Sequence, residues 1–108
     1  MSMSSWMWLG AAGAVEVLMA VALKRSESWT RLLPSVVGLA AALLSIFLLT
    51  LALKRLPLGT AYAVWTAIGA VGVALVGVAA FGESLSPWRL ACIGLVVAGT
   101  VGLRVLEG

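Results

Sequence analysis

The chain has 108 residues, of which 63% are hydrophobic and only 10% are charged, whereas soluble domains carry about a quarter charged residues. The composition therefore predicts a membrane protein, and the length suits a single domain over residues 1–108. The formal net charge of +3 comes from scattered basic residues beside apolar runs, where they act as membrane-end anchors. Nucleic acid is not an expected partner.

Missing residue types exclude several classes of chemistry. The chain has no histidine and one cysteine, Cys92, so it can form neither an internal disulfide nor a metal site built on Cys and His. Nucleophilic catalysis that relies on histidine is excluded as well. We therefore expect no enzyme, no metal and no cofactor. Cys92 is expected to be a small apolar residue of a helix.

Four apolar runs cover residues 5–23, 32–53, 58–81 and 88–106. A membrane-spanning helix needs about 20 apolar residues at 1.5 Å each, so each run is long enough. Proline, which is tolerated in the first turn of a helix, stands near three of the starts, as Pro34, Pro57 and Pro87. The sequence predicts an all-α membrane protein whose four helices, joined by short connections, alternate in direction.

Basic residues are divided almost evenly between the two membrane sides. The side that holds both termini has Lys54, Arg55 and Arg104, and the other side has Lys24, Arg25, Arg31 and Arg89. Orientation follows the excess of Lys and Arg, so a difference of one residue predicts insertion in both orientations. Two oppositely oriented copies could form an antiparallel dimer. The alternative is a fixed orientation set by other features.

One acid, Glu16, lies inside the apolar run "GAVEVLMAVALK". A charged acid at the bilayer centre costs about 2.5–3.5 kcal/mol on insertion scales, and such residues mostly serve a function. An acid that binds either a proton or a cation has the minimum equipment of an antiporter. The alternative is a structural acid, although no basic residue lies at a helix centre to pair with it.

The neighbours of Glu16 on its helix face include Gly13 and Met19, three residues before and after it. Small residues on this face predict a binding space beside the carboxylate, although small residues also pack membrane helices closely. Ser45 is the polar residue near the middle of the second run. Its hydroxyl could bond the carboxylate or a carbonyl of its own helix, and the sequence favours neither.

The third run contains "TAYAVWTAIGAVG", in which Tyr62 and Trp65 share a stripe. Aromatic rings attract cations, so we predict that both line the site, with an interfacial aromatic belt as the alternative. Gly69 and Gly72 follow, and glycine pairs often kink helices, which predicts a hinge. In the fourth run, three glycines predict a dimer contact, with Gly94 and Gly99 as its packing residues and Gly102 beyond them.

Three segments together, "GAVEVLMAVALKRSESWTRLLPS", "LPLGTAYAVWTAIGAVG" and "GESLSPWRLA", resemble the small multidrug resistance family over essentially the whole chain. The resemblance implies antiparallel homodimers or paired heterodimers of four-helix subunits that exchange protons for cations across the bacterial inner membrane. It also implies that Glu16 is the essential acid, Tyr62 and Trp65 the pocket aromatics, and Ser45 the serine of the second helix.

Within that family the chain resembles the guanidinium-exporting subtype. Gly13, "WTAIGAVG" and "GESLSPWRLA" match it, and Ala42 stands where the multidrug subtype has an aromatic residue. Met19 departs from the subtype, which usually has tryptophan there, and Ala67 replaces a common glycine. The flexible Met19 side chain predicts a looser pocket.

The resulting hypothesis is a proton-coupled exporter of guanidinium or substituted guanidinium ions. Glu16 would bind protons or substrate, Trp65 and Met19 would wall the site, and Tyr62 and Ser45 would hold the carboxylates by hydrogen bonds. The alternatives are a multidrug exporter of quaternary ammonium and other lipophilic cations, or one half of a heterodimeric pair. A proton-carrying rotor subunit is disfavoured, because such hairpins have two helices and this chain has four.

Overall fold

Four helices make up the computed structural model, which describes residues 3–106. They are α1 (Met3–Arg25), α2 (Leu32–Ala52), α3 (Leu58–Phe81) and α4 (Pro87–Leu106). Each is long and apolar enough to cross a membrane, which confirms the predicted architecture of four membrane-length helices. The first helix is longer than expected, by two residues at each end, because the apolar run continues into residues that also favour a helix.

The helix ends follow local sequence signals. Pro57 stands at the N-cap of α3, and Gly82 ends that helix in the left-handed conformation, with φ of 66°, which glycine adopts without steric cost. The Ser86 hydroxyl accepts a hydrogen bond of 3.1 Å from the backbone N–H of Arg89 and so caps α4. These signals place each turn within a few residues and force neighbouring helices to reverse direction.

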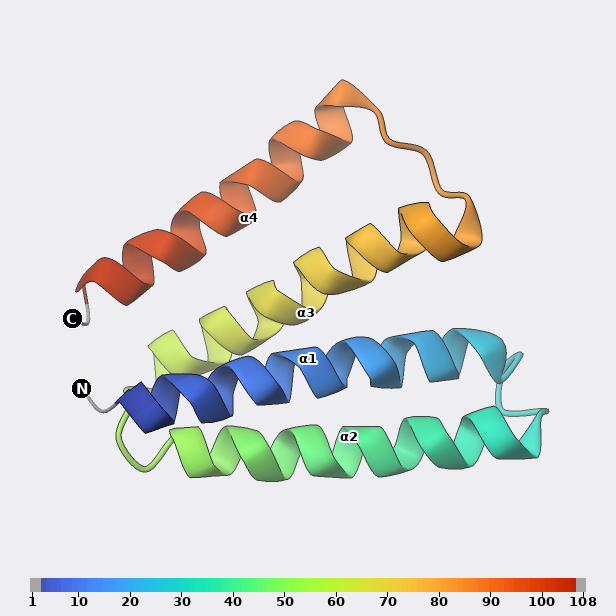
Figure 1. Cartoon of the computed structure of the whole chain (residues 1–108), viewed down its shortest axis with the longest axis horizontal. Helices are drawn as coiled ribbons and strands as arrows, with labels where there is room; N and C mark the ends of the chain where they lie inside the picture. The colour runs from blue at the N-terminus through green and yellow to red at the C-terminus, as the bar shows by residue number, and fades with distance from the viewer. Residues whose placement is uncertain (1–2, 107–108) are drawn as a thin grey trace.

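Helix α1 is the central helix of the arrangement. It lies between α2 and α3, while α4 packs on the far side of α3 (Figure 1). Both ends of the chain lie at the end of the molecule that holds the α2–α3 connection, and the other two connections lie together at the opposite end (Figure 1). Helices α1 and α3 therefore run in the same direction, side by side.

The buried core lies toward the end of the molecule that holds the α2–α3 connection. It is formed by Leu9, Ala12, Leu49, Ala52, Leu56, Ala61 and Val64. Its residues come from α1, from the end of α2, from the α2–α3 connection and from the start of α3. None of the α4 residues that the structure describes is buried, so this helix presents almost its whole surface to lipid or to another protein.

Helices α1 and α3 approach each other through glycine. A Cβ atom added to Gly13 would lie 2.7 Å from Cβ of Ile68, and one added to Gly72 would contact the Val17 side chain. Membrane helices associate through such small residues, because lipid tails are as apolar as the side chains they replace. The register of the two helices is thus fixed by side chains of one that fit over glycines of the other.

A Gly13→Ala substitution tests this contact. Because β-branched Ile68 has little rotamer freedom, the added methyl group must push α1 and α3 apart. We expect a loss of about 1–3 kcal/mol in the free energy of unfolding, measured by SDS titration in mixed micelles. Gly10→Ala on the same helix is the matched control, since no atom lies within 4 Å of its added Cβ. Equal stability of the two variants would contradict the proposed register.

Candidate proton and substrate site

The site is centred on Glu16, which lies half-buried on α1 and faces α3. Its carboxyl group rests against the backbone of Gly69. A Cβ atom added to Gly69 would lie 2.7 Å from the carboxyl carbon and 3.2 Å from Oε1 of Glu16. Gly69 therefore provides space for the carboxyl group, and any other residue at that position would displace it.

The carboxyl group has an unused hydrogen-bonding atom. Oε2 of Glu16 is buried and has no hydrogen-bond partner among the described residues. A buried polar atom without a partner is unfavourable, and a buried unpaired charge more so. A proton or a bound cation would remove this cost, so the arrangement suits a carboxyl group that always holds one of the two. No group of three or more metal-ligating side chains is found in residues 3–106.

Ser45 connects three helices without touching the carboxylate. Its hydroxyl donates a 2.7 Å hydrogen bond to the backbone carbonyl of Ala12 and accepts a 2.9 Å hydrogen bond from Nε1 of Trp65. Both readings of the sequence, a bond to Glu16 and a bond within its own helix, are therefore wrong in this structure. The physical reason is that Ser45 is buried on α2 where the backbone of α1 and the indole of α3 converge.

The two aromatic residues of α3 are in contact with each other. The rings of Tyr62 and Trp65 meet edge to face, with centroids 5.3 Å apart. The Trp65 indole is fixed by Ser45, whereas Tyr62 is 56% exposed and its hydroxyl makes no hydrogen bond within residues 3–106. The predicted bond from Tyr62 to Glu16 is thus not made within the subunit. Trp65 lies one turn before Gly69 and so close to the carboxyl group.

The remaining predicted site residues lie around this centre. Gly13 is buried under Ile68, so in the structure its place is the helix contact and not an open space beside the acid. Met19 is half-buried one turn after Glu16. Gly72 accommodates Val17, and α3 is continuous through both predicted hinge glycines. Packing explains these two glycines, and their role as a hinge remains a prediction.

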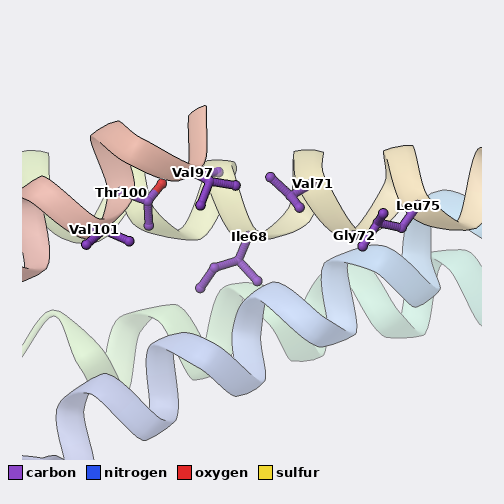
Figure 2. A pocket seen from close by; sticks show the side chains of 8 residues that line it. Ile68, Val71, Gly72, Leu75, Val97, Thr100 and Val101 are labelled. Carbon is purple, nitrogen blue, oxygen red and sulfur yellow. The ribbon is translucent and has the colours of Figure 1, made fainter. Parts of the chain in front are cut away.

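A cavity of about 320 Å³ separates α3 from α4 (Figure 2). Its lining is almost wholly apolar, and its one hydroxyl, on Thr100, is bonded to the carbonyl of Val96 at 2.8 Å. Ala67 lines this cavity and therefore acts on the α4 side of α3. Added Cβ atoms at Gly94 and Gly99 of α4 would meet nothing within 4 Å, so both are free to pack against another molecule.

Sequence reasoning missed two features. The backbone carbonyl of Ala12 takes part in the Ser45 network, and a carbonyl has no sequence signal. Glu83 ion-pairs with Arg89 at 2.6 Å and lines a second cavity of about 200 Å³ between α1 and α3. The available signal was the turn at the helix-ending Gly82, directly before this acid.

Comparison with known proteins identifies the family. The model of the Small Multidrug Resistance protein family matches residues 4–96. The chain belongs to the small multidrug resistance family. It is 52% identical over 101 residues to proteins of Citrobacter freundii and Klebsiella oxytoca, and 50% identical to one of Escherichia coli, all named guanidinium exporter. Each match covers 94% of this chain and 96% of the relative.

Family membership confirms the resemblance found in the sequence and has direct consequences. The chain is a multi-pass protein of the bacterial inner membrane and a transporter, not an enzyme. Its central acid therefore lies inside a bilayer, where an unpaired charge is most costly. The contact of Glu16 with Gly69 lies at the middle of two membrane-length helices.

A Ser45→Ala substitution tests the three-helix network. It leaves the Nε1–H of Trp65 without its partner and removes the side-chain hydrogen bond to the Ala12 carbonyl, so we expect a loss of about 1–3 kcal/mol in the free energy of unfolding. The Nε1–H resonance of Trp65 should also shift upfield in protein labelled with ¹⁵N-tryptophan. Thr50→Val is the control, because the Thr50 hydroxyl bonds only the Phe47 carbonyl of its own helix. An unshifted Trp65 resonance would contradict the assigned bond.

Proposed function

We propose that the protein is a proton-coupled antiporter that exports guanidinium or substituted guanidinium ions. The observation that carries this proposal is the buried, unpaired Oε2 of Glu16 within the membrane-spanning region. The names of the relatives supply the substrate class. A planar guanidinium group forms paired, charge-assisted hydrogen bonds to a carboxylate, which makes this acid chemically suited to such a cation.

Coupling follows from competition for one carboxyl group. A protonated Glu16 cannot bind a cation, and a cation-bound Glu16 cannot hold a proton. If the site opens to one membrane side at a time, each proton that enters exchanges for a cation that leaves. The Trp65 ring, fixed by Ser45 at 2.9 Å, would provide an aromatic wall for the cation.

We further propose that the working unit is an antiparallel dimer, with a paired heterodimer as the alternative. One subunit leaves Tyr62 exposed and offers Glu16 no hydrogen-bond donor within its described residues, so a partner could complete the site. The open faces at Gly94 and Gly99 on the unburied α4 suit a helix contact of small residues. The even division of basic residues supports two opposite orientations.

Selectivity depends on the side chains around Glu16. Met19 carries a flexible, polarizable side chain where a rigid indole would restrict the pocket, and Ala42 is too small to restrict it from α2. We therefore expect transport of substituted guanidinium ions in addition to guanidinium itself. Ala67 lines the cavity toward α4, so its influence on the Glu16 pocket is indirect.

The first test is transport by purified protein in liposomes, recorded as capacitive currents on a solid-supported membrane. We expect currents for guanidinium and phenylguanidinium, and their loss to the level of empty liposomes in Glu16→Gln, which cannot exchange a proton. The folding control is an unchanged elution volume of the variant in detergent. Coupled exchange by Glu16→Gln would refute the assignment of the acid. Currents for tetrapropylammonium but not for guanidinium would favour the multidrug alternative.

The second test concerns Met19. Met19→Trp restores a rigid aromatic wall, so we expect the ratio of phenylguanidinium to guanidinium current to fall severalfold while the guanidinium current is retained. Leu18→Trp, at an exposed neighbouring position of the same helix, is the control for the added indole. An unchanged ratio in Met19→Trp would place the selectivity elsewhere.

A further inference from the structure

A second carboxylate lies on α3 in the same way as that of Glu16. Gly82 reverses the chain after α3, and the backbone N–H groups of Gly82 and Glu83 both donate hydrogen bonds to the carbonyl of Gly77, at 3.1 Å from Glu83. The Glu83 side chain therefore folds back over α3. A Cβ atom added to Gly77 would lie 2.7 Å from the carboxyl carbon of Glu83.

Helix α3 thus carries two glycines that each accommodate a carboxyl group, Gly69 for Glu16 and Gly77 for Glu83. They are eight residues apart, which corresponds to about 12 Å along the helix. Gly69 and Gly77 must be small because a carboxyl group lies directly against each of them. Contact between helix backbones is not the reason. The repetition indicates two related positions along one groove between α1 and α3.

A cavity beside Glu83 extends along α1 and α3 toward the central site. It has a volume of about 200 Å³ and is lined by Ala20, Val21, Lys24, Val73, Val76, Gly77, Phe81 and Glu83. Two of these, Ala20 and Val73, lie one helical turn beyond Glu16 and Gly69, so the cavity ends one turn from the central acid. At its other end lies Glu83, close to the membrane surface.

The structure already contains a guanidinium group at Glu83. Nη2 of Arg89 donates a 2.6 Å hydrogen bond to Oε1 of Glu83, and Nη1 donates a 3.0 Å hydrogen bond to the Ser84 carbonyl. One carboxylate and one carbonyl therefore bind the fork of a guanidinium ion from two sides. The side chain of Glu83 is 45% exposed and that of Arg89 31%, so solvent and a soluble cation can reach the pair.

The charges around this end of the cavity make Glu83 important for any cation that enters. Lys24 lines the same cavity, Arg25 lies 5.3 Å from the ring centroid of Phe81, and Arg89 pairs with Glu83 itself. Without the carboxylate the lining of the cavity would carry only the positive charge of Lys24. A cation would then be repelled before it reached Glu16.

We propose that Glu83 and the Ser84 carbonyl form a second guanidinium-binding position at the entrance of the α1–α3 groove, occupied by Arg89 when no substrate is bound. An incoming guanidinium ion displaces Arg89, binds to Glu83 and then moves along the cavity to Glu16. This inference rests on the proposed function, because it takes guanidinium as the transported ion. It adds a position that captures substrate before the exchange with protons.

The test is the KM of guanidinium transport in two variants that break the same ion pair from opposite sides. Glu83→Gln removes the capturing acid, so KM should rise about three- to fivefold at low ionic strength. Arg89→Gln removes the internal competitor, so KM should fall by a similar factor. A purely structural ion pair would change KM in the same direction in both variants, and that result would overturn the proposal.

Two controls sharpen this test. Glu27→Gln neutralises an exposed acid in the connection at the same end of the molecule and should leave KM unchanged, which separates capture from general electrostatic attraction. The double variant Glu83→Gln/Arg89→Gln should have the raised KM of Glu83→Gln, because the position is lost whether or not Arg89 is present. A KM at or below the wild-type value in the double variant would overturn the proposal.

A binding experiment separates this proposal from the proposed function. Guanidinium is titrated into ¹⁵N-arginine-labelled Glu16→Gln protein in micelles, and the Nε–H resonance of Arg89 is followed. A saturable shift that disappears in Glu16→Gln/Glu83→Gln is expected. If wild-type protein transports guanidinium but the resonance does not move, the capture position is refuted and the antiporter stands. If the resonance moves and wild-type protein does not transport, the proposed function fails instead.

Discussion

The structure depends on one costly feature, a carboxyl group without a partner inside the membrane. Oε2 of Glu16 is buried and unbonded within the described chain, and hydrocarbon offers nothing to replace water around it. The fold therefore places the acid on α1, the helix that both α2 and α3 cover, and gives it Gly69 as a neighbour. Any protein group that satisfied the carboxylate permanently would also prevent exchange. Exchange thus requires that the Glu16 carboxyl group has no permanent partner, and the surrounding helices leave it without one.

The same constraint explains why helix packing relies on glycine. Apolar burial contributes little between helices in lipid, so close contact and a few buried hydrogen bonds must hold them together. Gly13 and Gly72 bring α1 and α3 into register, and the Ser45 hydroxyl links α1, α2 and α3 through two bonds. Helix α4 has no comparable contact and no buried residue among those described. Three helices therefore form the site, and the fourth is available for association.

Much of this could be predicted from the sequence, and the failures have a common cause. Hydrophobic run length and the prolines give the helices almost to the residue, and an acid in an apolar run identifies Glu16 without a structure. The partners of Ser45 could not be predicted, because they depend on the rotation of α2 about its axis and on a backbone carbonyl of α1. The contact of Gly69 with the Glu16 carboxyl group could not be predicted for the same reason. A helical wheel shows which residues share a face, but not which side chain of the neighbouring helix lies against it.

The Trp65 ring is held in place by Ser45, whereas the Glu16 carboxyl group is left unbonded. Attraction of a cation and release of a proton are thus assigned to different side chains. The single N–H donor of Trp65 bonds the Ser45 hydroxyl. Trp65 therefore cannot donate to the Glu16 carboxylate and stabilise its charged form. It can still present its ring to a cation, because a cation–π contact needs the face of the ring and not the N–H. The Met19 side chain has no hydrogen-bond donor, so it too could contact a cation without stabilising the charged carboxylate. In the proposed mechanism, such a pocket would attract the substrate without making the carboxylate too stable to take up a proton, which is the condition for exchange.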